Sequence, residues 1–186
     1  MRIWALTALL LAIALAAVYT TTVDHIISDI IAIDRSVKAL TSAVSQSDGG
    51  LYSKAVIAAL FAVVSFNTAK GGIDARFLPR GSSSSSSSSS VVVDAADAER
   101  VIATVRETLD ITNPRAVKAF EAKKAHFQSW GQDVVVAAAL RLILHEHLFF
   151  SNAVLERTPA GHLADATDAV DIISKALEAG IATFNS

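Results

Sequence analysis

The stretch that decides the fold runs from Asp133 to Leu155 and reads DVVVAAALRLILHEHLFFSNAVL. Between Val134 and Leu144, apolar residues occupy almost the whole circumference of a helix with 3.6 residues per turn. A helix that is apolar all round is buried, either in a membrane or at the centre of a helical bundle. A membrane span needs about 20 uninterrupted apolar residues, whereas this stretch contains Arg141, His145, Glu146, His147 and Asn152. We therefore interpret it as the core helix of a bundle.

Composition limits the classes of protein to which the chain can belong. It has 186 residues, 52% of them hydrophobic, which suits one domain with a sizeable core. The formal net charge is -2 and no stripe of Lys and Arg is present, so a nucleic-acid partner is not expected. The sequence has no cysteine, which excludes disulfides, zinc thiolate sites and thiol nucleophiles.

The first 17 residues have the pattern of a signal peptide. Arg2 is followed by the apolar run Ile3 to Leu15, and Ala14-Leu15-Ala16 has the small-x-small pattern of a cleavage site. We expect residues 18–186 to form a single domain that is secreted, extracellular and without a transmembrane span after cleavage. The alternative is a signal anchor that stays in place.

Apolar residues at spacings of three and four predict amphipathic helices in the rest of the chain. The clearest apolar seam comprises Val23, Ile26, Ile30, Ile33, Val37, Leu40 and Val44, and Asp48-Gly49-Gly50 ends that helix. Further helices are predicted from about Leu51 to Leu78 (weakened or kinked at Gly71-Gly72), from about Val92 to Asp110, from Asn113-Pro114 to Gly131, and from Ala160 onward. The predicted fold class is all-α, an antiparallel bundle of five to six amphipathic helices.

Nine consecutive serines, Ser82 to Ser90, interrupt this pattern. Such a run buries no apolar surface and cannot offset the entropy of ordering, so we predict a disordered loop at about residues 79–91. The run is either a site for O-linked sugars or an insert without a role.

Several motifs together point to a family. Asp29-Ile30-x-x-Ile33-Asp34-x-x-Val37-x-x-Leu40-x-x-Ala43-Val44 is followed by Asp48-Gly49-Gly50-Leu51, by Lys123-Lys124-x-x-Phe127-x-x-x-Gly131 and by Ile181-Ala182-Thr183-Phe184. In this order, from about Val23 to Phe184, they resemble the fungal hydrophobic surface-binding protein A family, which includes the antigenic cell wall galactomannoproteins. The resemblance implies a secreted helical bundle that adsorbs to hydrophobic surfaces or holds a fatty acid. It provides no catalytic residues, and the serine run departs from its pattern.

Motifs for metal binding or catalysis are weak. His145 and His147 lie two residues apart and point about 200° apart on a helix, so they cannot chelate one ion there. A single histidine, as an imidazolium, is a candidate partner for a fatty-acid carboxylate. Asp165, Asp168 and Asp171 are typical of a solvated helix face. We therefore expect no enzyme activity, no metal and no cofactor.

Large apolar side chains are the candidate ligand contacts, although ordinary core packing is the alternative for each of them. The predicted hydrophobic lining comprises Phe66, Phe120, Phe127, Leu140, Leu144, Leu148, Phe149, Ile173 and Leu177. The predicted partners are hydrophobic surfaces, fatty acids or other lipids, with cell-wall glycans as a further candidate. The competing hypothesis is a structural cell-wall glycoprotein that carries sugars on Ser82 to Ser90 and binds no small ligand.

Overall fold

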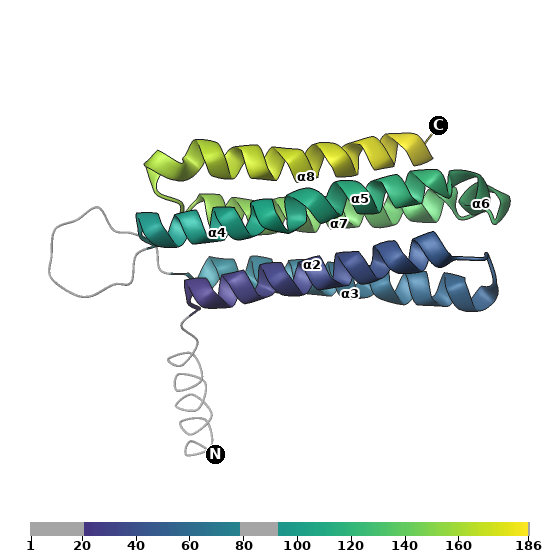
Figure 1. Cartoon of the computed structure of the whole chain (residues 1–186), viewed down its shortest axis with the longest axis horizontal. Helices are drawn as coiled ribbons and strands as arrows, with labels where there is room; N and C mark the ends of the chain where they lie inside the picture. Colours follow the sequence, from purple (N-terminus) through teal and green to yellow (C-terminus); the bar gives the residue numbers. More distant parts are fainter. Residues whose placement is uncertain (1–20, 79–92, 186) are drawn as a thin grey trace, which may run out of the picture.

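The structure, a computed structural model, describes residues 21–78 and 93–185. The predicted signal peptide and the predicted serine loop lie outside these ranges. The described residues form helices α2 (Val23–Gln46), α3 (Leu51–Phe77), α4 (Ala95–Glu107), α5 (Leu109–Ala122), α6 (Lys124–Ser129), α7 (Asp133–Leu155) and α8 (Leu163–Phe184), with a short 3-10 helix η1 (Ala160–His162) (Figure 1). This part of the chain contains no strand, and the all-α prediction is confirmed.

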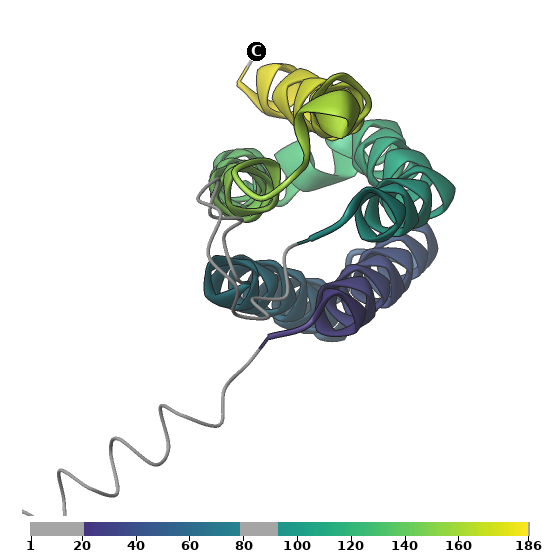
Figure 2. The ribbon, with the colours of Figure 1, turned by 90° about the vertical axis from the view of Figure 1, so that its left-hand side faces the viewer.

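The long helices form a closed ring. Helix α2 contacts α3 and α5, α3 contacts α7, α7 contacts α8, and α8 contacts α5, so each member has two neighbours (Figure 2). Helices α4 and α5 follow one another as one broken rod on the same side of the ring (Figure 1). Rods that follow one another in the chain run in opposite directions, as an antiparallel bundle requires.

Some neighbours in the ring nevertheless run in the same direction. The Ser65 hydroxyl of α3 donates to Glu146 of α7 at 2.6 Å, and Arg157 just after α7 donates to the Leu78 carbonyl just after α3. These two contacts fix α3 and α7 side by side with their carboxyl ends together. The α3 and α7 pair thus forms one side of the ring (Figure 2).

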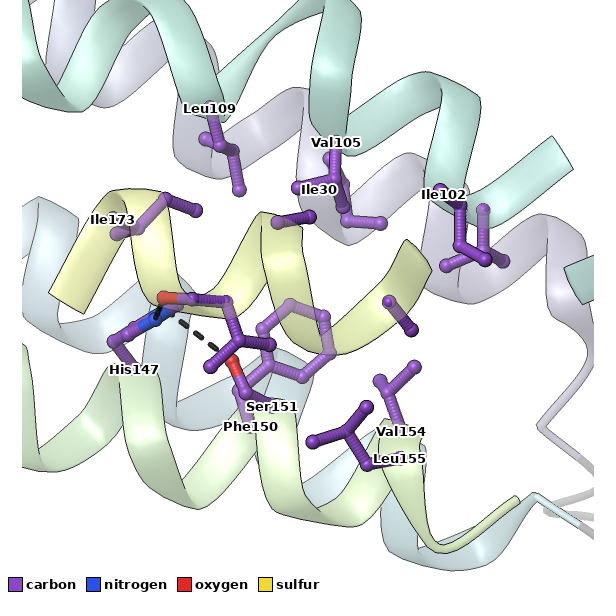
Figure 3. Close-up of a pocket in the computed structure, with 14 residues that line it drawn as sticks. Ile30, Ile102, Val105, Leu109, His147, Phe150, Ser151, Val154, Leu155 and Ile173 are labelled. Carbon is purple, nitrogen blue, oxygen red and sulfur yellow. Dashed lines mark hydrogen bonds between the residues drawn. The ribbon is translucent and has the colours of Figure 1, made fainter. Parts of the chain in front are cut away.

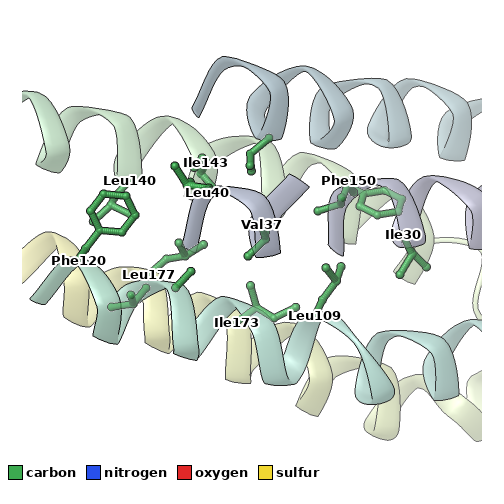
Figure 4. Close-up of a cluster of buried hydrophobic side chains, with 14 of the residues drawn as sticks. Ile30, Val37, Leu40, Leu109, Phe120, Leu140, Ile143, Phe150, Ile173 and Leu177 are labelled. Carbon is green, nitrogen blue, oxygen red and sulfur yellow. The ribbon is translucent and has the colours of Figure 1, made fainter. Parts of the chain in front are cut away.

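The core lies along the axis of the ring. All seven residues of the α2 seam are buried, and side chains from α3, α5, α7 and α8 meet them (Figure 4). The two buried aspartates of α2 each accept a hydrogen bond from a lysine. Lys70 donates to Asp29 at 2.6 Å, and Lys38 donates to Asp34 at 2.7 Å. Burial raises the pKa of Asp29, an effect that the Lys70 ammonium opposes.

Helix α7 has the bounds that its sequence predicts, but the expectation of a helix buried all round is wrong, because α7 is one member of the ring and Val134, Val135 and Leu142 are exposed. Val136, Ala137, Leu140, Ile143 and Phe150 are buried between α3 and α8. Both α7 and α3 are long and apolar enough to cross a membrane by composition alone. The apolar side chains on one side of α7 are therefore buried in the core, and those on the opposite side are exposed.

Helix α3 buries a stripe of mostly small residues and exposes its stripe of larger apolar residues. The residues facing the interior are Ile57, Val64, Thr68, Gly71, Gly72 and Ala75. Larger residues at helical spacing, including Leu51, Phe66, Ile73 and Phe77, face outward and are exposed. The predicted weakening at Gly71-Gly72 leaves no break, because α3 is continuous through both glycines.

The predicted helix start at Asn113-Pro114 is wrong. The chain breaks one turn earlier, at Thr108, whose φ of -122° and ψ of -82° are not helical, and Pro114 lies inside α5. Pro114 is the sixth residue of α5 and removes the hydrogen bond to the Asp110 carbonyl, yet α5 continues through it. The Asn113 side chain donates to the Leu109 carbonyl at 3.1 Å and does not cap a helix.

Candidate functional site

An apolar pocket lies inside the ring at the level where α4 meets α5. Its fourteen lining residues are Ile30 from α2, Val101, Ile102 and Val105 from α4, Leu109 from α5, His147, Phe150, Ser151, Val154 and Leu155 from α7, and Ala166, Ala169, Val170 and Ile173 from α8 (Figure 3). Only His147 and Ser151 are polar. The open space is about 490 Å³, including the part continuous with solvent, and about 50 Å³ of it admits the centre of a water-sized sphere.

His147 and Ser151 form the polar element of the pocket. Nε2 of His147 lies 3.3 Å from the Val170 carbonyl oxygen, and Nδ1 lies 3.3 Å from the Ser151 hydroxyl (Figure 3). A carbonyl can only accept, so Nε2 carries the proton and the Ser151 hydroxyl donates to Nδ1. Both residues are only 7% exposed.

The histidine of this pair is uncharged at neutral pH. Burial lowers the pKa of His147 from 6.5 to about 4, and the hydrogen bond to Val170 offsets that effect only in part. No charged side chain lines the pocket. An imidazolium partner for a carboxylate, which the sequence suggested, is therefore absent from this pocket at neutral pH.

Two smaller apolar spaces lie in the same interior as the main pocket. One, toward the amino end of α7, is lined by Val37, Leu40, Phe61, Val64, Asn113, Ala116, Val117, Phe120, Leu140, Ile143 and Leu177. The other shares Val101, Ile102 and Val154 with the main pocket and ends at Arg157 and Thr158. Figure 4 shows the row of side chains from Phe120 and Leu140 at one end to Ile30 and Phe150 at the other. Apolar side chains thus form a column along the interior, in which the main pocket and the space toward the amino end of α7 share no lining residue.

Four of the predicted lining residues face this column. Ile173 lines the main pocket, and Phe120, Leu140 and Leu177 line the space toward the amino end of α7. Leu144 is partly buried against the same core.

Phe127 lies in an aromatic cluster at the end of the bundle where α6 is found (Figure 1). Its ring centroid is 5.6 Å from that of Phe120, 5.4 Å from Trp130 and 6.0 Å from Phe184. It is buried but lines none of the three spaces described above. Its contacts are those of a packed core residue.

The other three predicted lining residues lie on the outside. Phe66 is 67% exposed on α3 and Leu148 is 39% exposed on α7. Phe149 packs on Gly72 of α3, with the Arg76 guanidinium 4.0 Å from the centre of its ring. Their position on the helices decides this placement, because Phe66 and Phe149 lie roughly opposite the stripe that faces the core and Leu148 lies about 100° from it.

Sequence reasoning missed Ser151, Val154 and Ile102 as pocket residues. Ser151 follows His147 by one helical turn, a spacing that places two polar side chains on the same face. The four-residue spacing could therefore have predicted a pair of polar side chains on one face of this apolar helix. The contribution of α4 depends on where the α4 and α5 rod lies in the ring, which periodicity does not specify.

The residues considered for metal binding lie apart in the described part of the chain. No group of three His, Asp or Glu side chains gathers there. His145 is exposed, Glu146 faces α3 and His147 faces the core, so the three point in different directions. Asp165 and Asp171 are exposed and pair with Arg106 and Lys175, as a solvated face does.

Solved structures with this fold contain fatty acids. AfMP4P in complex with palmitic acid superposes with a TM-score of 0.77 at 20% identity, covering 88% of this chain and 99% of that one. Ligand binding domain 1 of Penicillium marneffei MP1 protein, complexed with arachidonic acids, gives 0.74 at 17% identity, covering 89% and 99%. Domain 2 of the same protein, with multiple arachidonic acids, gives 0.71 at 20% identity, covering 84% and 92%. At these identities the likeness establishes the fold.

Sequence comparison identifies the family. A comparison with curated proteins found no match. The family described as hydrophobic surface binding protein A matches residues 23–156. This match confirms the resemblance and covers α2 to α7, whereas the likeness of α8 rests on the fold. The chain therefore belongs to the hydrophobic surface binding protein A family.

Proposed function

We propose that the protein is a secreted carrier that holds one acyl chain along the interior column of the bundle. The observation that carries this proposal is the apolar pocket with a single buried polar pair, His147 and Ser151. Three structures with the same fold, AfMP4P and the two MP1 domains, hold palmitic or arachidonic acid. Each buried methylene contributes about 0.8 kcal/mol, so ten methylenes offset roughly 8 kcal/mol of binding costs.

The acyl chain has to displace side chains to enter. Pockets that hold whole ligands measure about 300–1,000 Å³, and only about 50 Å³ of this one admits the centre of a water-sized sphere. The lining residues that must move are mainly Ile, Val and Leu, which change rotamer without breaking hydrogen bonds. Binding therefore widens the column from the main pocket toward Leu140 and Leu177.

The polar head of the ligand lies at Ser151. Neither Ser151 nor neutral His147 supplies a positive charge, and burying an ionised carboxylate without a partner costs several kcal/mol. A carboxylic acid therefore enters with a proton, and a long-chain alcohol fits the same position. Palmitate uptake should accordingly strengthen as the pH falls from 8 toward 5, whereas hexadecanol uptake should not change.

Native mass spectrometry of the secreted protein, followed by solvent extraction, tests the proposal. We expect a stoichiometric fatty acid, and we expect Ala169→Phe, which fills the pocket from α8, to abolish palmitate uptake. Ala179→Phe is the matched control, because Ala179 is exposed on the same helix. Bare protein that also fails to take up added palmitate contradicts the carrier function. It would leave the structural wall glycoprotein, which requires sugars on Ser82 to Ser90.

A further inference from the structure

The outer side of the α3 and α7 pair carries apolar residues in two matching rows. On α3 they are Ala59, Phe66 and Ile73, and on α7 they are Val135, Leu142 and Phe149, each set at seven-residue spacing. A seven-residue step is almost two helical turns, so each row stays on one face. The hydrogen bond from Ser65 to Glu146 and the contact of Gly72 with Phe149 set the two rows side by side.

The residues of these rows are exposed except Phe149, which is half-buried against Gly72. Phe66 is 67% exposed, Ile73 51%, Val135 56% and Leu142 50%, and Phe77 extends the α3 row at 59%. We call this surface the α3/α7 strip. It is about 27 Å long, from the 18 residue steps between Ala59 and Phe77 at about 1.5 Å each, and two helices wide. Its shape is extended.

Little unpaired charge lies on the strip. Lys70 pairs with both Asp29 and Asp74, and the Arg76 guanidinium lies 4.0 Å from the centre of the Phe149 ring. Glu146 accepts from Ser65 between the two helices, and Arg141 donates to Asn185 at the end of α8. The strip therefore matches an uncharged apolar surface, because contact with such a surface does not bury an unpaired charge.

We propose that the folded bundle adsorbs through the α3/α7 strip to apolar solid surfaces, without opening its helices. Membership of the hydrophobic surface binding protein A family supplies the class of partner. The shape, exposure and charge of the strip identify the face. The proposal does not depend on an acyl chain in the interior, because the pocket opens between α2, α4, α5, α7 and α8.

Depletion of the protein from solution by alkyl-coated silica beads tests the strip. Phe66→Ser combined with Leu142→Ser should weaken adsorption by at least about tenfold, because two exposed apolar side chains are lost from the contact. Ile111→Ser combined with Ile172→Ser is the matched control, since both residues are exposed on other helices. We expect that control to change adsorption by less than about twofold. Palmitate uptake by either double variant should equal that of the parent protein, which keeps this test separate from the carrier function.

Three results would overturn the proposal. The first is equal loss in both double variants, or no loss in either. The second is loss of amide-exchange protection in α2 and α5 on the beads, which would mean that the bundle opens. The third is a concentration-dependent dimer that the strip variant abolishes, or binding to anionic phosphatidylglycerol vesicles without binding to beads. Those two observations would assign the strip to a second copy or to a membrane.

Discussion

Gly72 lies directly beneath the ring of Phe149, and a Cβ atom added at Gly72 would be 2.2 Å from the Phe149 Cδ1 atom. Its neighbour Gly71 is different, because a Cβ atom there would make ordinary contacts of 3.5 Å with Asp29 and Phe150. Two adjacent glycines in one helix therefore have different roles. Gly72 permits α3 and α7 to approach, whereas Gly71 lowers helix propensity without a matching steric need.

Alanine at these two positions should change stability in opposite directions. Gly72→Ala forces the Phe149 ring to move and should lower the free energy of unfolding by about 2 kcal/mol. Gly71→Ala should leave it unchanged or raise it by up to about 1 kcal/mol, because alanine favours the helix. Urea denaturation measures both. In a double-mutant cycle, Phe149→Ala should remove most of the cost of Gly72→Ala; additive effects would contradict the contact.

Stability should depend on pH through His147. Its pKa is about 4 in the fold and 6.5 in the unfolded chain. The stabilisation is therefore fully present above pH 6.5 and is lost as the pH falls toward 4. A shift of this size corresponds to at most about 3 kcal/mol. In His147→Gln this part of the pH dependence should disappear, whereas exposed His145→Gln should follow the parent curve from pH 4 to 7.5.

Asp110 should make stability depend on pH in the opposite direction to His147. Burial raises its pKa from 3.8 to about 6, Arg106 opposes that effect, and Oδ1 has no hydrogen-bond partner within the described residues. A raised carboxyl pKa gives stability that is present below pH 3.8 and lost as the pH rises through 6. Asp110→Asn should therefore stabilise the protein by about 1 kcal/mol at pH 7.5, after allowance for partial solvent screening, and by nothing at pH 3.5. Asp168→Asn, on the exposed face of α8, should have no effect at either pH.

Arg157 should hold the carboxyl ends of α3 and α7 together. Its guanidinium donates to the carbonyls of Ala153, Leu78 and Arg76 at 2.7, 3.0 and 2.7 Å, and its side chain is only 4% exposed. Arg157→Met removes these donors and should destabilise the protein by about 3 kcal/mol, with faster amide exchange near the end of α3. Lys175→Met breaks only the exposed pair with Asp171 and should cost less than about 0.5 kcal/mol. Similar losses for the two variants would argue against this role.

Local patterns were enough for most of the helices. The seam from Val23 to Val44 predicted α2, and the apolar run from Asp133 to Leu155 predicted the bounds of α7. Gly49 and Gly131, with φ of 86° and 64°, mark turns that the sequence also indicated. Periodicity predicts these helices because the residues that one helix buries recur every 3.6 positions in its own sequence.

Only the tertiary structure decided which apolar stripe faces inward. In α3 the larger residues, such as Phe66, lie outside, and the small ones, such as Gly72, face α7 because two helices pack closely there. The pocket likewise joins Ile102, Ser151 and Ile173 from three helices, a grouping that depends on the order of helices in the ring. The sequence by itself determined the helical class, the bounds of α7 and the family. The position of the pocket and the neutral state of His147 required the packed bundle, because burial among residues distant in the chain sets both.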